Sequence, residues 1–287
     1  MILLITLTSL FTTKFMENPT RQPNETPQLK EKIAQLNAWI QQQLEQGKIQ
    51  YDRSPLTTDY QWEQNGDNVT IQAPTLNNVA AKGSRKWQEQ GELKGTCREI
   101  APALAQILEQ SGQLKNTQVL ACTNDGEFHY VVVGDLESED GGEGRVLIDM
   151  GYSQPVPQAI LINGGLQESN YYNDQLGKGQ IYGGKVTYEA IDSEEGVDFM
   201  IGYDKGQKTK MFKFQPVEQV DQDIVRRFAS VTGKMSRTEV VSTGDSRQIN
   251  RTDTAGANSF KELHDLMQKV GDQVRVAVKY TDEEEKA

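Results

Sequence analysis

The chain has 287 residues, of which 36% are hydrophobic and 25% are charged, and its formal net charge is −11 at pH 7. This length is ample for a hydrophobic core in one large or two to three small packed units. The acidic balance argues against nucleic acid as a partner, because no basic stripe is present to neutralise phosphates. Only two cysteines occur, so we expect no disulfide framework, which is typical of a reducing compartment.

We expect residues 1–25 to be a leader, which is either disordered or lies before the true start of the protein. The apolar stretch within residues 1–15 is too short to span a bilayer and lacks a positively charged leading region. Two interpretations stay open, a weak signal sequence or a translation start at Met16. We therefore expect a cytoplasmic protein with no membrane partner, and secretion is the alternative.

Three elements are predicted before the first cysteine. Thr26 and Pro27 have the form of an N-cap and a first helical residue, and the apolar stripe that follows ends at Gly47. Two β-rich runs flank a turn at residues 65–67 and predict a hairpin. A weaker helical pattern, interrupted by Gly83, then extends from Thr75 to Gln90.

Cys97 is predicted at the start of a helix that closes at Ser111 and Gly112. Thr96 and Glu99 have the spacing of a capping box, which makes Cys97 the first helical residue. The alternative is a helix that begins at Pro102, with Cys97 in the preceding turn. A sulfur at a helix N-terminus lies near N–H donors and the positive end of the dipole, which favour the thiolate. The competing interpretation is a small buried apolar residue.

The next strands supply partners for this thiol. Residues 119–122 and 128–133 flank a turn and predict a hairpin, and His129 opens its second strand. After an acidic, glycine-rich loop over residues 135–144, a third strand carries Asp149 near its end. Adjacent antiparallel strands bring His129 and Asp149 side by side. Cys97, His129 and Asp149 then match the nucleophile, base and orienting group of a thiol enzyme.

The remaining cysteine and histidine have simpler interpretations. Cys122 alternates inside a predicted strand and is expected to be a packing residue. His264 lies beside the apolar stripe of a predicted helix, where we expect it to be solvated or to cap the helix.

Several of these segments resemble the arylamine N-acetyltransferases, a branch of the transglutaminase-like thiol enzymes. The resemblance is carried by Cys97-Arg98-Glu99, by the helix ending at Gly112, by His129, and by residues 147–152 followed by two prolines. The order Cys, His, Asp is the family's order. The Gly95-x-Cys97 opening is also similar to transglutaminase-like cores in general.

The rest of the chain predicts further β-structure and a C-terminal α/β region. Residues 163–184 are rich in glycine and tyrosine and are expected to form a loop. Alternating apolar residues then predict three strands in an antiparallel meander. These strands fall at residues 186–190, 197–201 and 212–214, and they are followed by a helix at 217–230, a strand pair at 236–248, a helix at 260–270, a strand at 274–278 and an acidic tail at 281–287.

The predicted fold class is α+β. The resemblance implies a papain/transglutaminase-like core with a mainly helical N-terminal region, an antiparallel β-barrel and a C-terminal α/β lid. The expected boundaries are residues 26–115 for the helical region with Cys97, residues 116–215 for the barrel, and residues 216–287 for the lid with its acidic tail.

The function that the resemblance implies is acyl transfer. Acetyl-CoA or another acyl thioester is expected to acylate Cys97, and a small-molecule amine is expected to take the acyl group. No permanently bound cofactor and no metal is expected, and the oligomeric state does not follow from the sequence. Two alternatives remain: a transglutaminase-like cysteine hydrolase or protease that uses the same three residues, and a non-catalytic binding protein of the same fold.

Overall fold

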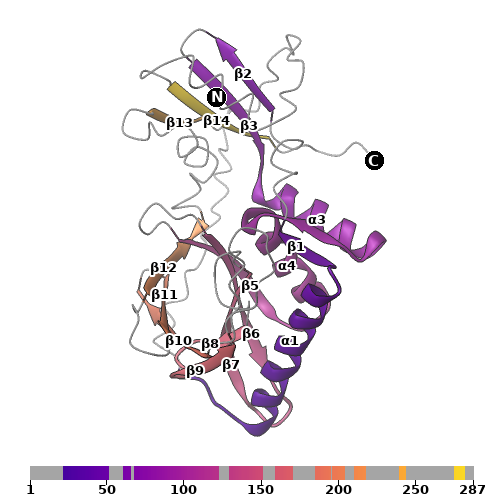
Figure 1. Cartoon of the computed structure of the whole chain (residues 1–287), viewed down its shortest axis with the longest axis vertical. Helices are drawn as coiled ribbons and strands as arrows, with labels where there is room; N and C mark the ends of the chain where they lie inside the picture. The colour runs from indigo at the N-terminus through magenta and orange to yellow at the C-terminus, as the bar shows by residue number, and fades with distance from the viewer. Residues whose placement is uncertain are drawn as a thin grey trace, which may run out of the picture.

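The computed structural model describes residues 22–51, 61–65, 68–122, 129–150, 159–170, 185–194, 196–203, 210–217, 239–243 and 275–281. The fold is mixed α+β: N-terminal helices cover one side of a nearly closed, antiparallel eight-stranded sheet, and a four-stranded sheet lies beyond them (Figure 1). The predicted helix at 217–230 beyond Val217, the predicted helix at 260–270, His264 and most of the leader fall outside the described residues. Within the described residues, no helix has the length and hydropathy needed to cross a membrane.

The first helix, α1 (Pro27–Glu45), has the predicted N-cap. The hydroxyl of Thr26 accepts a hydrogen bond from the backbone N–H of Leu29 at 3.2 Å. Leu29, Leu36 and Ile40 are buried along one face of the helix, because they recur at helical spacing. The short strand β1 (Ile49–Tyr51) follows and pairs in parallel with β4 (Leu93–Gly95).

The helix α3 (Leu76–Gln90) begins at its predicted cap, Thr75, and ends at Gly91, which has φ +67°. It packs against α4 (Cys97–Gln110), which also contacts two strands of the large sheet. Helix α4 starts at Cys97 and contains Pro102, so the alternative start at Pro102 is wrong. Most of α4 is buried, which makes it the central helix of the helical layer.

The large sheet has the strand order β8-β7-β6-β5-β12-β11-β10-β9, with every neighbouring pair antiparallel. Its strands are β5 (Lys115–Cys122), β6 (His129–Glu137), β7 (Glu143–Asp149), β8 (Ala159–Leu161), β9 (Gln167–Asn170), β10 (Lys185–Ser193), β11 (Gly196–Tyr203) and β12 (Lys210–Pro216). The predicted meander is confirmed as β10, β11 and β12. The predicted loop at 163–184 is wrong over residues 167–170, where polar residues pair with β10 as β9. The predicted loop at 135–144 is shorter than expected, because both flanking strands extend into it.

The two ends of this sheet approach each other. Ile162 forms an isolated parallel bridge with Ala190. The side-chain amide of Gln167 donates to the carbonyl of Leu161 at 2.9 Å and accepts from its N–H at 3.1 Å, as a neighbouring strand would. These contacts nearly close the sheet into a barrel.

The buried residues form two clusters, one on each face of the barrel wall. The first lies between the helices and the sheet and includes Leu104 and Tyr130. The second lies inside the barrel, where four aromatic rings pack together with centroid separations of 5.7–6.4 Å. The rings are those of Tyr188, Phe199, Phe212 and Phe214, and each side chain is buried.

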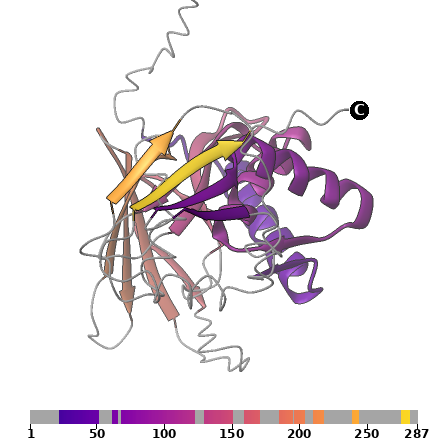
Figure 2. The ribbon, with the colours of Figure 1, turned by 90° about the horizontal axis from the view of Figure 1, so that it is seen from above.

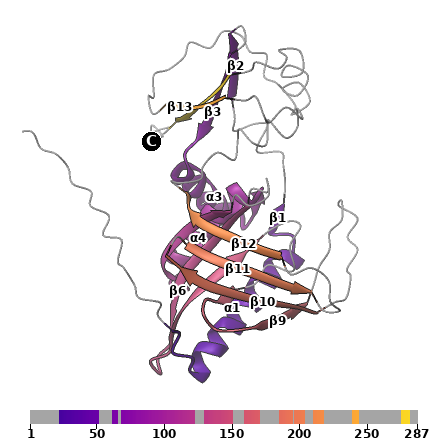
Figure 3. The same ribbon diagram turned by 90° about the vertical axis from the view of Figure 1, so that its left-hand side faces the viewer.

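The smaller sheet has the order β13-β14-β3-β2 and combines both halves of the chain (Figures 2 and 3). Its strands are β2 (Gln61–Asn65), β3 (Asn68–Pro74), β13 (Glu239–Thr243) and β14 (Arg275–Thr281). The predicted hairpin is the antiparallel β2–β3 pair, and β3 pairs in parallel with β14. The sheet therefore joins strands from the expected helical region to strands from the expected lid, which sequence periodicity does not indicate.

Candidate functional site

The start of α4 is a buried, tightly packed turn. Thr96, Cys97, Arg98 and Glu99 are all buried, and the carboxylate of Glu99 accepts hydrogen bonds from the backbone N–H of Thr96 at 2.8 Å and from its hydroxyl. The predicted capping box is therefore present. A Cβ atom on Gly95 would lie against the Glu99 side chain, only 3.2 Å from its Cγ, so this close approach requires glycine.

His129 and Asp149 occupy neighbouring strand ends. His129 is the first residue of β6 and Asp149 is the last residue of β7, and the register pairs Asp149 with Val131, two residues after His129. The Nε2 atom of His129 lies 2.5 Å from Oδ1 of Asp149. Their side chains are only 11% and 6% exposed, so this pair is shielded from water.

The structure brings all three predicted site residues together. Cys97 lies near enough to His129 to raise the pKa of the imidazole, and His129 in turn bonds with Asp149. Helix α4 thus contributes one member and the β6–β7 pair contributes two. We call this arrangement the Cys97–His129–Asp149 cluster.

The electrostatics of the cluster favour a charged imidazole. Burial is the largest single influence on the pKa of His129 and lowers it, because the charged form loses solvation. The charge of Asp149 and its hydrogen bond raise the pKa, as do the hydrogen bond and charge of Cys97, and together they outweigh burial. The pKa of His129 therefore lies well above the ordinary value of 6.5. Such a histidine can accept the proton of a neighbouring thiol.

Two further residues border His129 on the barrel side. The ring of Phe214 on β12 packs edge-on against the imidazole with a centroid separation of 6.2 Å. Cys122 lies directly opposite His129 in the β5–β6 register and has no exposed surface. The prediction that Cys122 is a packing residue is confirmed, and its position beside His129 adds a feature that the sequence pattern does not reveal.

Arg98 is one of the largest fully buried side chains of the described residues, although the sequence pattern predicts no role for it. Its guanidinium donates a hydrogen bond to the carbonyl of Pro74 at 3.0 Å. The only signal for it in the sequence is a charged residue within the apolar stretch that follows Cys97.

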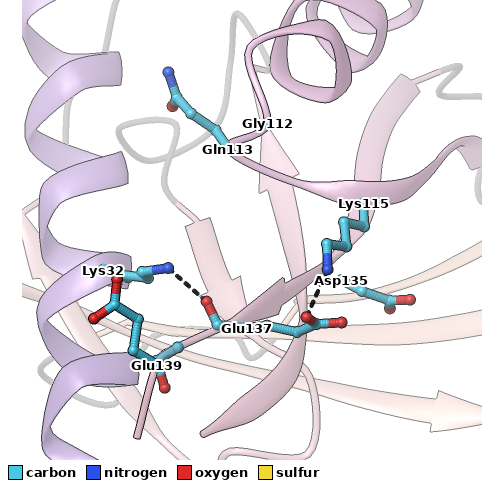
Figure 4. Close-up of a pocket in the computed structure, with 8 residues that line it drawn as sticks. Lys32, Gly112, Gln113, Lys115, Asp135, Glu137 and Glu139 are labelled. Carbon is cyan, nitrogen blue, oxygen red and sulfur yellow. Dashed lines mark hydrogen bonds and ion pairs between the residues drawn. The ribbon is translucent and has the colours of Figure 1, made fainter. Parts of the chain in front are cut away.

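A separate pocket of about 240 Å³ lies at the opposite end of the same elements (Figure 4). It is lined by Gly112 and Gln113 after the C-terminus of α4, whereas Cys97 begins this helix of about 21 Å. The ammonium groups of Lys32 and Lys115 both bond to Glu137, one to its carbonyl and one to its carboxylate. Both lysines of the pocket are thus engaged with Glu137, and the pocket stands apart from the cluster.

The described residues contain no group of three or more His, Cys, Asp or Glu side chains arranged to hold a metal ion. Comparison with known proteins adds no relative, because no family model, no curated protein and no solved structure matches the chain.

Proposed function

We propose that the protein is a thiol-dependent acyltransferase in which Cys97, His129 and Asp149 act as a catalytic triad. The observation that carries this proposal is the position of Cys97 beside His129, which bonds with Asp149. A nucleophile, a base and a group that orients the base form the minimal machinery for covalent acyl transfer.

The proposed roles follow from the contacts. Asp149 holds Nε2 of His129, so Nδ1 is the ring nitrogen left to exchange a proton with the thiol. The thiolate of Cys97 attacks the carbonyl carbon of an acyl thioester, and the tetrahedral intermediate collapses with loss of the donor's thiolate. The imidazolium of His129 protonates this leaving thiolate, which completes the first half-reaction with an acyl group on Cys97.

The second half-reaction reverses these roles. An amine attacks the Cys97 thioester while His129 accepts the proton of the amine, and Cys97 leaves as a thiolate. In both tetrahedral intermediates, backbone N–H groups at the start of α4 are suited to stabilise the oxyanion, because the helix N-terminus carries a partial positive charge.

Burial of the cluster supports transfer over hydrolysis. Cys97 is 4% exposed, His129 is 8% exposed and Asp149 is 4% exposed. A thioester in so dry a site is protected from water until an acceptor binds. The resemblance to arylamine N-acetyltransferases points in the same direction and supports acyl-CoA as donor and a small amine as acceptor. It also supports a papain/transglutaminase-like core, in which the helical layer presents Cys97 and the barrel presents His129 and Asp149.

An end-point transfer assay tests the proposal. The protein is incubated with acetyl-CoA and an arylamine, and the acetylated amine is quantified by chromatography. We expect product from the wild type and from Cys122→Ala, and none from Cys97→Ser, because Cys122 is only a packing residue. Cleavage of a glutamine amide or a peptide bond by the wild type, without transfer from any of several acyl-CoA donors, would instead support the cysteine hydrolase.

A further inference from the structure

The imidazole of His129 lies between two neighbours on the inner side of the barrel. In the strand order β7-β6-β5-β12, Asp149 approaches from one side of β6 and Phe214 from the other. Nε2 of His129 lies 2.5 Å from Oδ1 of Asp149, and the ring of Phe214 packs edge-on against the imidazole at a centroid separation of 6.2 Å. The histidine is therefore flanked by a hydrogen bond on one side and by an aromatic ring on the other.

A row of three residues in register accounts for the contact with Phe214. Cys122 on β5 is paired with His129 on β6 and with Phe214 on β12. Directly opposite residues of antiparallel strands lie on the same face of a sheet, and Cys122 and Phe214 both belong to the cluster inside the barrel. Two strand spacings of about 4.8 Å separate β6 from β12, whereas the two ring centroids are only 6.2 Å apart. The rings of His129 and Phe214 therefore lean toward each other over the small side chain of Cys122.

The hydrogen bond to Asp149 does not by itself fix the plane of the imidazole. The χ2 angle of histidine has a broad energy profile, so a ring that is bonded through one nitrogen can still turn. Such a turn would move Nδ1, the nitrogen that is left for proton exchange when Asp149 holds Nε2. A general base must lie within hydrogen-bond reach of the proton that it accepts, so the orientation of this ring matters to its work.

Phe214 is itself held in place. Its side chain has no exposed surface, and its ring packs against those of Phe199 and Phe212 at centroid separations of 6.2 Å and 6.1 Å. Side chains in a close-packed interior occupy rotamer minima, so Phe214 presents a fixed wall to the imidazole. Because Phe214 is not accessible to substrate, its influence on the reaction is expected to pass through His129.

We propose that Phe214 is a positioning residue that holds the imidazole of His129 at one χ2 angle for the proton transfers of the proposed function. The inference rests on that function, because His129 is its base. Asp149 fixes one nitrogen of the ring, Phe214 restricts the ring plane, and the small side chain of Cys122 leaves the room in which the two rings meet.

Nuclear magnetic resonance of the histidine rings tests the inference without any substrate. The chain has only two histidines, so the ring signals of ¹³C-histidine-labelled protein are few, and a spectrum of His264→Gln assigns those of His129. The order parameter of the Cε1–H bond of His129 is measured in the wild type, Phe214→Leu and Phe199→Leu. Phe199→Leu is the matched control, because it removes the same ring from the same cluster at a position whose recorded ring contacts are with Tyr188, Phe212 and Phe214.

We expect the order parameter of His129 to be about 0.85 in the wild type and to fall below about 0.6 in Phe214→Leu. Phe199→Leu is expected to keep the wild-type value. In the transfer assay with acetyl-CoA and an arylamine, kcat should fall by about 10- to 100-fold in Phe214→Leu, because a misplaced base seldom reaches the productive geometry. KM should stay within about twofold of the wild type, since Phe214 does not contact substrate, and Phe199→Leu should keep both constants within about twofold.

A wild-type order parameter or a wild-type kcat in folded Phe214→Leu would overturn the inference, and so would an equal loss of both in Phe199→Leu. If Phe214→Leu does not fold by circular dichroism, the wild type decides. An order parameter of His129 below about 0.6 would then refute the inference, and a value near 0.85 with a nuclear Overhauser effect between the rings of His129 and Phe214 would support it. Failure of the proposed function would look different, because the wild type would give no acylated amine while the order parameters would still show whether Phe214 holds the ring.

Discussion

Replacing Asp149 with asparagine removes the carboxylate that most strongly raises the pKa of His129. Asparagine has nearly the same shape, so Asp149→Asn tests the charge and leaves the packing of β7 in place. The pKa of His129 falls in this variant because the negative charge of Asp149, the largest influence that raises it, is removed. A lower pKa makes the imidazole of His129 a weaker base toward the neighbouring thiol.

The size of the effect follows from the 2.5 Å hydrogen bond between the two side chains. A hydrogen bond to a charged group contributes about 1.5–3 kcal/mol, which corresponds to about one to two pKa units. We therefore expect alkylation of Cys97 at pH 7 to slow by about 10- to 100-fold in Asp149→Asn. Alkylation of Cys122 is expected to stay negligible in both proteins, because its side chain is fully buried.

The same variant changes the pH dependence of stability. Because the pKa of His129 is raised in the folded state, its protonation stabilises the fold fully below the unfolded value of 6.5, and this contribution is lost as the pH rises through the folded pKa. The difference in free energy of unfolding between the wild type and Asp149→Asn should thus be largest from about pH 5 to 6.5 and narrow at higher pH. Urea unfolding across this range measures it.

The assay is iodoacetamide labelling with peptide mapping, and Asp135→Asn is the control. Asp135 is on the same β6–β7 pair and accepts a hydrogen bond from Asn116 at the surface, so its substitution makes the same change in charge far from Cys97. Wild-type labelling rates and an unchanged pH profile in folded Asp149→Asn would refute the reasoning, because His129 would then not depend on this carboxylate.

Three further predictions concern the surrounding fold. Gly95→Ala places a methyl group against the side chain of Glu99. We expect the free energy of unfolding, measured with urea, to fall by about 1–3 kcal/mol and the labelling of Cys97 to slow. A free energy of unfolding equal to that of the wild type would show that the turn can open at no cost. Asp140→Asn removes an exposed carboxylate whose pKa is lowered by hydrogen bonds, chiefly from Ser138 and then from Thr26. The free energy of unfolding of the wild type should therefore exceed that of the variant above the ordinary pKa of 3.8. This difference should vanish as the pH falls through the folded pKa. A difference that persists at pH 2 would contradict this assignment. Phe199→Ala should cost about 3–5 kcal/mol because Phe199 is fully buried, and a loss below about 1 kcal/mol would mean that the barrel interior is loosely packed.

Local sequence signals were sufficient for the elements that carry the cluster. The capping spacing of Thr96 and Glu99 located the start of α4 at Cys97, and His129 opens the strand that alternation predicts. Adjacency of two antiparallel strands was enough to expect His129 beside Asp149. These predictions succeeded because helix caps and strand periodicity depend on residues that are close in the chain.

Features that depend on long-range pairing were not predictable in this way. The parallel pairing of β3 with β14 joins residues about 200 positions apart, and no local pattern specifies such a partner. The strand β9 is polar and short, so its pairing with β10 is imposed by the barrel and not by its own composition. Arg98 is the clearest case at the site, because the acceptor of its hydrogen bond, Pro74, lies in another element.

The central claim is that Cys97 carries the acyl group during transfer, and intact-protein mass spectrometry tests it most directly. The wild type and Cys97→Ala are incubated with acetyl-CoA without an amine, and an arylamine is then added. We predict that the wild type gains the mass of one acetyl group, that the adduct maps to Cys97, and that the amine discharges it, whereas Cys97→Ala gains nothing. An adduct of equal yield on Cys97→Ala, or none on the wild type with any of several acyl-CoA donors, would contradict the claim.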